Sequence, residues 1–248
     1  MSETSRHRLR RGIRPGRRPL TCYHEAGHCF ARWWSGHSFD CVLVLTTEQV
    51  VRNVRALNRR GVPVTEAEGF MDGYDLKSSL TLDMLDAMGG EPDLVSQFRR
   101  VALVSVEMDL IENYIGAAAE ARYRKCSANA AMLTGGAEDL AQAGRTLDNW
   151  YPDPDARRIA SIQAIQRAAA LVRSEAGWRA IAALATTLLQ RGEVQWTEAE
   201  PLLAAAYGHE RPNPNAWIAA WPPSLAMIRD GQLPEQDMHR NDALIAKE

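Results

Sequence analysis

The chain has 248 residues, of which 46% are hydrophobic and 24% charged, and its formal net charge at pH 7 is -2. This composition is typical of a folded globular protein, and it excludes the disordered, collagen-like and disulfide-scaffold classes. The length favours one principal domain with appendages, since a domain has ~150 residues on average.

The N-terminal arm is strongly basic. Its first 19 residues carry seven arginines against a single acid, Glu3. They show no apolar periodicity, so residues 1–18 are expected to be disordered. Several arginines could neutralise phosphates, but no aromatic residues are interleaved with them. The arm is therefore expected to be a solubilising tail or tether, and nucleic acid is not an expected partner.

Membrane insertion and disulfide bonding are not expected. No stretch reaches the ~18 uninterrupted apolar residues of a spanning helix, and the basic N-terminus lacks the apolar run of a signal peptide. The chain is therefore expected to be cytoplasmic and without a membrane partner. The four cysteines include no Cys-x-x-Cys pair, which indicates reduced thiols rather than a disulfide frame or a thiolate zinc site.

The first predicted elements are a helix and a strand. Pro19 suits the first turn of a helix, and apolar residues recur from there at spacings of three and four as far as Trp34. Residues 39–46 are β-branched and apolar, which predicts a short strand. Glycines and prolines divide residues 47–92, so this stretch is expected to be a loop-rich excursion.

Helices dominate the second half of the chain. They are predicted over residues 93–124, whose end is rich in small side chains, over residues 137–150, and over residues 155–190 with a break near Gly177. Thr197 begins a capping-box pattern, which places the start of one more helix there.

The C-terminal extension contains five prolines after Gly208, which exclude long helices. Trp217 and Trp221 are too apolar for a free tail, so this part is expected to pack on the body or on a partner. The sequence thus predicts a mainly α fold with a small β element. Its expected parts are an arm (1–18), a principal domain (19–208) and a Pro-rich extension (209–248).

The most informative motif lies in the first predicted helix, where residues 24–28 read His-Glu-Ala-Gly-His. Four residues rise ~6 Å and slightly exceed one turn, so His24 and His28 stand one above the other on one face. Their nitrogens can share one ion. Zinc is expected, because it accepts imidazole ligands in a tetrahedron that leaves a position for water. Glu25 could take a proton from that water and pass it to a leaving amine.

A third protein ligand must come from elsewhere, and two acidic residues beside small residues are candidates. Glu120 ends a long helix, where a carboxylate can either bind zinc or orient an imidazole. Asp139 lies in the first turn of the next helix, after two flexible glycines that let the backbone approach a metal. The residues alone leave both candidates open.

Three segments resemble a known family. Residues 23–28, followed by an apolar helix and the apolar residues 42–45, resemble the peptidase domain of FtsH-type proteases, the M41 metallopeptidases. Residues 115–121 (Ile-Gly-Ala-Ala-Ala-Glu-Ala) are similar to the family's Gly-Gly-Arg-Ala-Ala-Glu-Glu segment. Residues 134–140 (Thr-Gly-Gly-Ala-Glu-Asp-Leu) are similar to its Thr-Gly-Ala-x-Asn-Asp-Leu segment. The similarity extends over most of residues 19–207, but only these segments are specific.

The resemblance implies a helical, FtsH-like metallopeptidase domain in which His24, His28 and Asp139 hold zinc. It also implies that Glu120 supports a ligating histidine and that Glu25 is the catalytic base. The chain departs from the family in having neither transmembrane helices nor an AAA+ ATPase, and no phosphate-binding Gly-x-x-x-x-Gly-Lys loop. Residues 47–92, whose family counterpart includes a substrate-binding edge strand, have no clear match.

The expected function is ATP-independent zinc endopeptidase activity on flexible or unfolded protein segments. The expected partner is a protein or peptide substrate; a homo-oligomer and a separate ATPase or regulatory protein remain open. The alternative is a non-proteolytic zinc-binding regulatory or interaction protein that retains the peptidase fold. The intact Glu25 favours the enzyme, whereas the missing ATPase and the unmatched substrate region favour the alternative.

Overall fold

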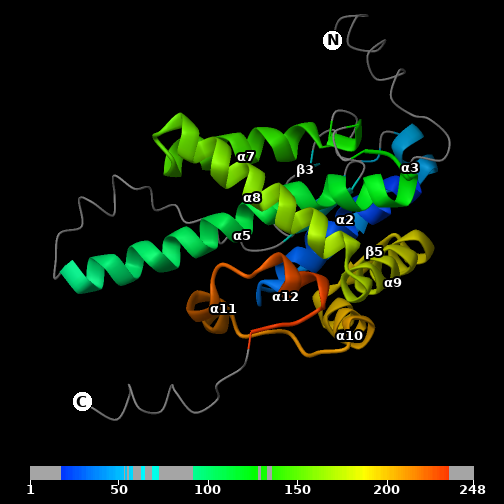
Figure 1. Cartoon of the computed structure of the whole chain (residues 1–248). Helices are drawn as coiled ribbons and strands as arrows, with labels where there is room; N and C mark the ends of the chain where they lie inside the picture. The colour runs from blue at the N-terminus through cyan, green and yellow to red at the C-terminus, as the bar shows by residue number, and fades with distance from the viewer. Residues whose placement is uncertain are drawn as a thin grey trace, which may run out of the picture.

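The structure is a computed structural model that describes residues 18–52, 54, 56–57, 63–64, 69–72, 92–127, 130–132 and 136–234. The predicted arm, apart from Arg18, lies outside these residues, as do most of the predicted excursion and the end of the C-terminal extension. The described part is mainly α with a small antiparallel sheet, which confirms the predicted fold class (Figure 1).

Two long helices form the centre of the molecule. Helix α2 (Arg18–Trp34) packs against α5 (Pro92–Arg124), and nearly every residue in the second half of α2 is buried. Gly27 makes this close contact sterically feasible, because a Cβ there would lie 3.0 Å from the Ile115 carbonyl oxygen and 3.2 Å from Ala119 Cβ. The small residues at the end of α5 therefore bring the two backbones together.

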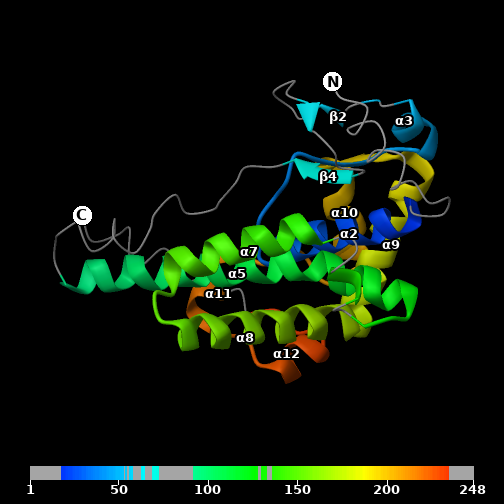
Figure 2. The ribbon, with the colours of Figure 1, turned by 90° about the horizontal axis from the view of Figure 1, so that it is seen from above.

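Further helices surround this pair. Helices α7 (Ala137–Trp150) and α8 (Pro154–Arg173) lie beside α5 (Figure 2), and α9 (Glu175–Arg191) packs on α2 and on α10 (Trp196–Tyr207). The predicted helices at 93–124 and 137–150 are thus confirmed.

Two predicted boundaries were wrong by a few residues. The break between α8 and α9 lies at Ser174 rather than near Gly177, because the Ser174 hydroxyl accepts the Gly177 N–H at 3.0 Å and so caps α9. Likewise α10 is capped by Gln195 and Glu198, not by Thr197, because a strand runs directly into this helix.

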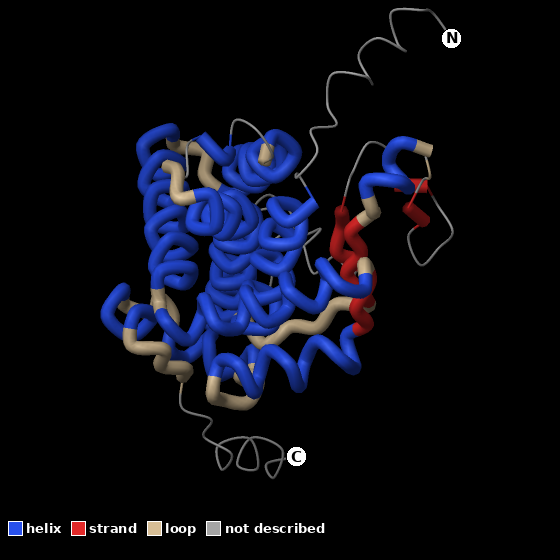
Figure 3. The backbone as a smooth tube through the Cα atoms, turned by 90° about the vertical axis from the view of Figure 1, so that its right-hand side faces the viewer, coloured by secondary structure: helices blue, strands red, loops and turns tan. Residues whose placement is uncertain are grey.

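The sheet has the strand order β4-β1-β5, with both pairings antiparallel. Its central strand β1 (Cys41–Val44) confirms the predicted strand, and it pairs with β4 (Gly69–Asp72) and β5 (Glu193–Gln195), which were not predicted. Figure 3 shows these strands together at one side of the helices. Among its described residues, the segment predicted as loop-rich also contains the short elements α3 (Thr47–Val51), β2 (Ala56–Leu57) and β3 (Pro63–Val64).

The described part of the C-terminal extension packs on the body through α11 (Pro214–Ala220) and α12 (Leu225–Arg229). The Trp217 indole is fully buried, and its Nε1 donates to the Trp34 carbonyl at 2.8 Å. The predicted packing of this apolar stretch is therefore confirmed for the described residues. The proposed division of the chain at residue 208 stays a prediction.

None of the described helices combines the length and hydropathy that crossing a membrane requires. All four cysteines are free, as predicted: Cys22 and Cys29 are buried, Cys41 is half-buried and Cys126 is exposed. Burial raises the pKa of Cys22 to about 11. The deeply buried thiols thus stay protonated at neutral pH.

Replacing Trp217 with alanine should lower the free energy of unfolding by about 3–5 kcal/mol, since the substitution empties a buried aromatic site and removes an indole hydrogen bond. Urea denaturation followed by circular dichroism measures the change. Leu225→Ala, at a position that is 48% exposed, is the control and should change stability by less than about 1 kcal/mol. Equal effects of the two variants would contradict the anchoring of the extension by Trp217.

Candidate metal centre

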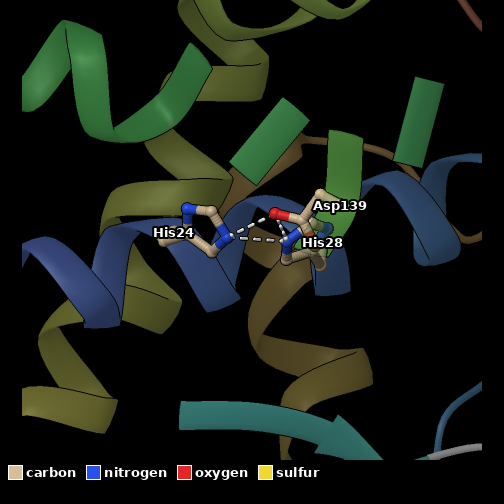
Figure 4. Close-up of side chains that lie close together, drawn as sticks. All are labelled: His24, His28 and Asp139. Atoms are coloured by element: carbon tan, nitrogen blue, oxygen red, sulfur yellow. Dashed lines mark hydrogen bonds and ion pairs between the residues drawn. The ribbon is translucent and has the colours of Figure 1, made fainter. Parts of the chain in front are cut away.

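The side chains of His24, His28 and Asp139, which the sequence predicts to be metal ligands, lie close together (Figure 4). The Nε2 atoms of His24 and His28 lie 3.0 Å apart, and Asp139 Oδ2 lies 3.0 Å from the first and 3.6 Å from the second. The histidines come from α2, whereas Asp139 comes from the first turn of α7. Elements distant in sequence thus place two nitrogens and one oxygen together.

The distances suit a tetrahedral metal ion. Ligand atoms at ~2.0 to 2.1 Å from zinc stand about 3.4 Å apart in a tetrahedron, close to the three separations measured here. Two imidazoles and one carboxylate form a ligand set that zinc accepts, and three protein ligands leave a fourth position for water or substrate. The residues present therefore fit a catalytic zinc ion.

The remaining nitrogen of each imidazole faces an oxygen on α5. His28 Nδ1 donates to the Glu112 carbonyl at 2.7 Å, since a carbonyl oxygen can only accept. His24 Nδ1 faces Glu120 Oε2 at 3.8 Å, and the other oxygen of Glu120 accepts from Arg124 at 2.8 Å. With Nδ1 protonated, each neutral imidazole presents its Nε2 lone pair to the common point.

Gly116 leaves room for an ion at this point. A Cβ at Gly116 would lie 2.4 Å from His28 Nε2 and 2.8 Å from His24 Nε2, distances that real Cβ atoms do not show. The α5 backbone therefore borders the ligand nitrogens directly. Any larger residue would occupy the space between the histidines and helix α5.

The histidines and carboxylates of the cluster stabilise one another's charged forms and shift one another's pKa values. Burial disfavours the protonated form of His24, but hydrogen bonding to Asp139 and Glu120 outweighs it and raises the pKa of His24 to about 10. Burial also disfavours ionised Asp139, yet His28 and His24 together hold the pKa of that carboxyl well below its usual value. The cluster therefore keeps protons on imidazole when no cation is bound, and a divalent cation must displace them.

Glu25 lies between the cluster and the sheet. It is buried, and desolvation raises the pKa of its carboxyl although both ligating histidines oppose this shift. A Cβ at Gly69, the first residue of β4, would lie 2.8 Å from Glu25 Cγ and 3.1 Å from Glu25 Oε1. The carboxylate that the motif predicts to be a base thus lies directly beside strand β4.

The structure places all five predicted site residues together. His24, His28 and Asp139 form the three-atom cluster, Glu120 lies behind His24, and Glu25 lies beside the cluster. Sequence reasoning missed three features: the space left by Gly116, the carbonyl of Glu112 and the approach of β4 to Glu25. Only Gly116 carried a signal, because its i-4 and i+4 neighbours on α5 are Glu112 and Glu120.

Comparison with the models of known protein families finds no match, and comparison with curated proteins finds none either. The interpretation of the cluster therefore rests on its geometry, on the donor atoms and on the resemblance of the three segments.

Replacing Gly116 with alanine should abolish stoichiometric zinc binding while the protein still folds. The added methyl group meets both ligand nitrogens, whereas alanine inside a helix is favoured by about 1 kcal/mol over glycine. Isothermal titration calorimetry with Zn²⁺ and far-UV circular dichroism measure the two properties. Gly144→Ala on α7 is the control, since nothing lies within 4 Å of its added Cβ. Wild-type zinc affinity in Gly116→Ala would contradict the location of the ion.

The two acidic candidates should differ in their effect on metal affinity. Asp139→Ala removes a ligand, so its loss should exceed that of Glu120→Ala, which is expected in the ~10 to 100-fold range for groups that orient a ligand. Competition with a chromophoric zinc chelator gives both affinities. The roles are reversed if Glu120→Ala gives up the metal more readily than Asp139→Ala.

Proposed function

We propose that this protein is a zinc-dependent endopeptidase that cleaves flexible or unfolded protein segments without ATP. The observation that carries the proposal is the convergence of His24 Nε2, His28 Nε2 and Asp139 Oδ2 beside the buried carboxylate of Glu25. This arrangement combines three candidate metal ligands with an adjacent carboxylate, and three protein ligands would leave a fourth position of a tetrahedral ion for water, as metal-assisted hydrolysis requires. The resemblance to FtsH-type peptidases supports the same assignment.

The chemistry divides between the ion and the chain. A zinc ion held here would polarise the scissile carbonyl and lower the pKa of a water molecule. Glu25 accepts the proton of the attacking water and delivers it to the leaving amine, a role that its position beside the three ligand atoms supports. Helix α5 orients the two imidazoles, because His28 Nδ1 donates to the Glu112 carbonyl and His24 Nδ1 faces Glu120 Oε2.

Strand β4 supports peptide rather than small-molecule binding. It pairs with β1 along one edge, and among the described strands none pairs with its other edge. An extended peptide that added to this edge would gain main-chain hydrogen bonds independent of its side chains. Because Gly69 starts β4 beside Glu25, such a peptide would pass close to the base. Main-chain binding of this kind suits unfolded segments of varied sequence.

Glu25→Gln should retain zinc and the fold but lose hydrolysis by ~10² to 10⁴-fold, because the amide keeps the shape and cannot accept a proton. Cleavage of a fluorescently labelled unfolded protein, in the absence of ATP, measures the rate. Glu138→Gln is the matched control, since Glu138 is an exposed neighbour of Asp139 and its side chain is 85% exposed.

A cleavage rate of Glu25→Gln within threefold of the wild-type rate would contradict the assignment of Glu25 as the base. Zinc bound at one equivalent without any cleavage by the wild type would instead favour the non-proteolytic, regulatory alternative. The two outcomes are read from separate measurements, zinc content and product formation.

A further inference from the structure

His28 is oriented by a backbone carbonyl, which belongs to a residue inside helix α5. Its Nδ1 donates to the Glu112 carbonyl at 2.7 Å, and this bond fixes both the ring orientation and the tautomer. Glu112 lies within helix α5, and its side chain makes a further contact across to α2 that can restrain its position.

Arg32 makes that contact. It lies one helical turn after His28 on the same face of α2, and it is only 7% exposed. Its NH1 lies 3.4 Å from Glu112 Oε1, and its Nε donates to the Ser38 carbonyl at 3.1 Å. A planar guanidinium held at two points has little freedom, so it ties Glu112 to the end of α2.

We propose that Arg32 is a positioning residue for the metal ligand His28, acting through Glu112. Glu112 is held by its carboxylate and offers its carbonyl to His28, so one residue transmits the constraint. The inference rests on the proposed function to the extent that the site binds a divalent cation. It goes beyond the ligand set, because Arg32 touches neither the ligand atoms nor the ion.

The chain offers a matched control pair, in which an arginine of α8 contacts a carboxylate on the same helix α5. Arg167 NH1 lies 3.3 Å from Glu107 Oε2, with side chains 10% and 24% exposed, whereas those of Arg32 and Glu112 are 9% and 22% exposed. Glu107 also accepts from Trp221 Nε1 at 2.8 Å, so this second pair anchors the C-terminal extension. Loss of either pair removes a similar half-buried charge contact. Of these two pairs, Arg32–Glu112 is the one that is linked to the candidate ligand His28.

The test uses the full chain and compares Arg32→Met, Arg32→Lys and Arg167→Met. Arg32→Met should weaken Zn²⁺ binding by ~10 to 100-fold in chelator competition and alter the visible spectrum of the Co²⁺-loaded protein. Arg32→Lys should recover part of the affinity, because lysine keeps the charge but not the two-point fork. Arg167→Met should lower the melting temperature comparably and leave affinity and spectrum unchanged.

A double variant keeps the test valid if Arg32→Met does not fold. Arg32→Met combined with Glu112→Met leaves no unpaired buried charge, and exchange of both partners is often neutral for stability. The double variant should lose as much zinc affinity as Arg32→Met alone, because both substitutions interrupt the same chain of contacts from Arg32 through Glu112 to His28. Wild-type affinity and spectrum in either variant overturn the proposal, and so does an equal loss in Arg167→Met.

The outcome for the wild type separates this inference from the proposed function. Zinc binding without cleavage of unfolded protein contradicts the endopeptidase and leaves the role of Arg32 to be decided by affinity and spectrum. A wild type that binds no zinc contradicts both proposals.

Discussion

The close crossing of α2 over α5 is the constraint on which the site depends. Two rows of residues spaced by four face each other: His24, His28 and Arg32 on α2, and Glu112, Gly116 and Glu120 on α5. Glycine on both helices brings the backbones within reach, so an imidazole can use a main-chain carbonyl as its partner. A wider crossing would separate the histidines from every α5 oxygen that orients them.

This crossing also buries several ionisable groups in the middle of an apolar core. A buried charge is tolerated only when it is paired and hydrogen-bonded. Such partners are present for His24, His28, Arg32 and Glu120. The third candidate ligand comes from a different part of the fold. Asp139 lies on α7, and the buried residues of this helix are Ala143 and Trp150. The free energy of metal binding is therefore expected to contribute to the docking of α7.

The sequence predicts the helices far better than the sheet. Helical periodicity is local, so the helices at 93–124 and 137–150 were predicted to within about one residue. Strands β4 and β5 were missed because they are short and acquire their structure only from distant pairing, as with Leu43 and Glu193. The histidine pair follows from helical spacing, but the choice between Asp139 and Glu120 needed the resemblance. The carbonyl of Glu112 could not be predicted, since a backbone group has no side-chain signature.

The pKa of the buried Glu25 carboxyl depends on whether a cation occupies the cluster. With no cation, desolvation raises the pKa of Glu25, and the nearby carboxylate of Asp139 adds to the shift. A divalent cation among the three ligands adds positive charge close to Glu25 and favours its ionised form. In the proposed function, this ionised form is the state of Glu25 that can accept a proton. Desolvation opposes this effect, so burial and a bound cation act on the pKa of Glu25 in opposite directions.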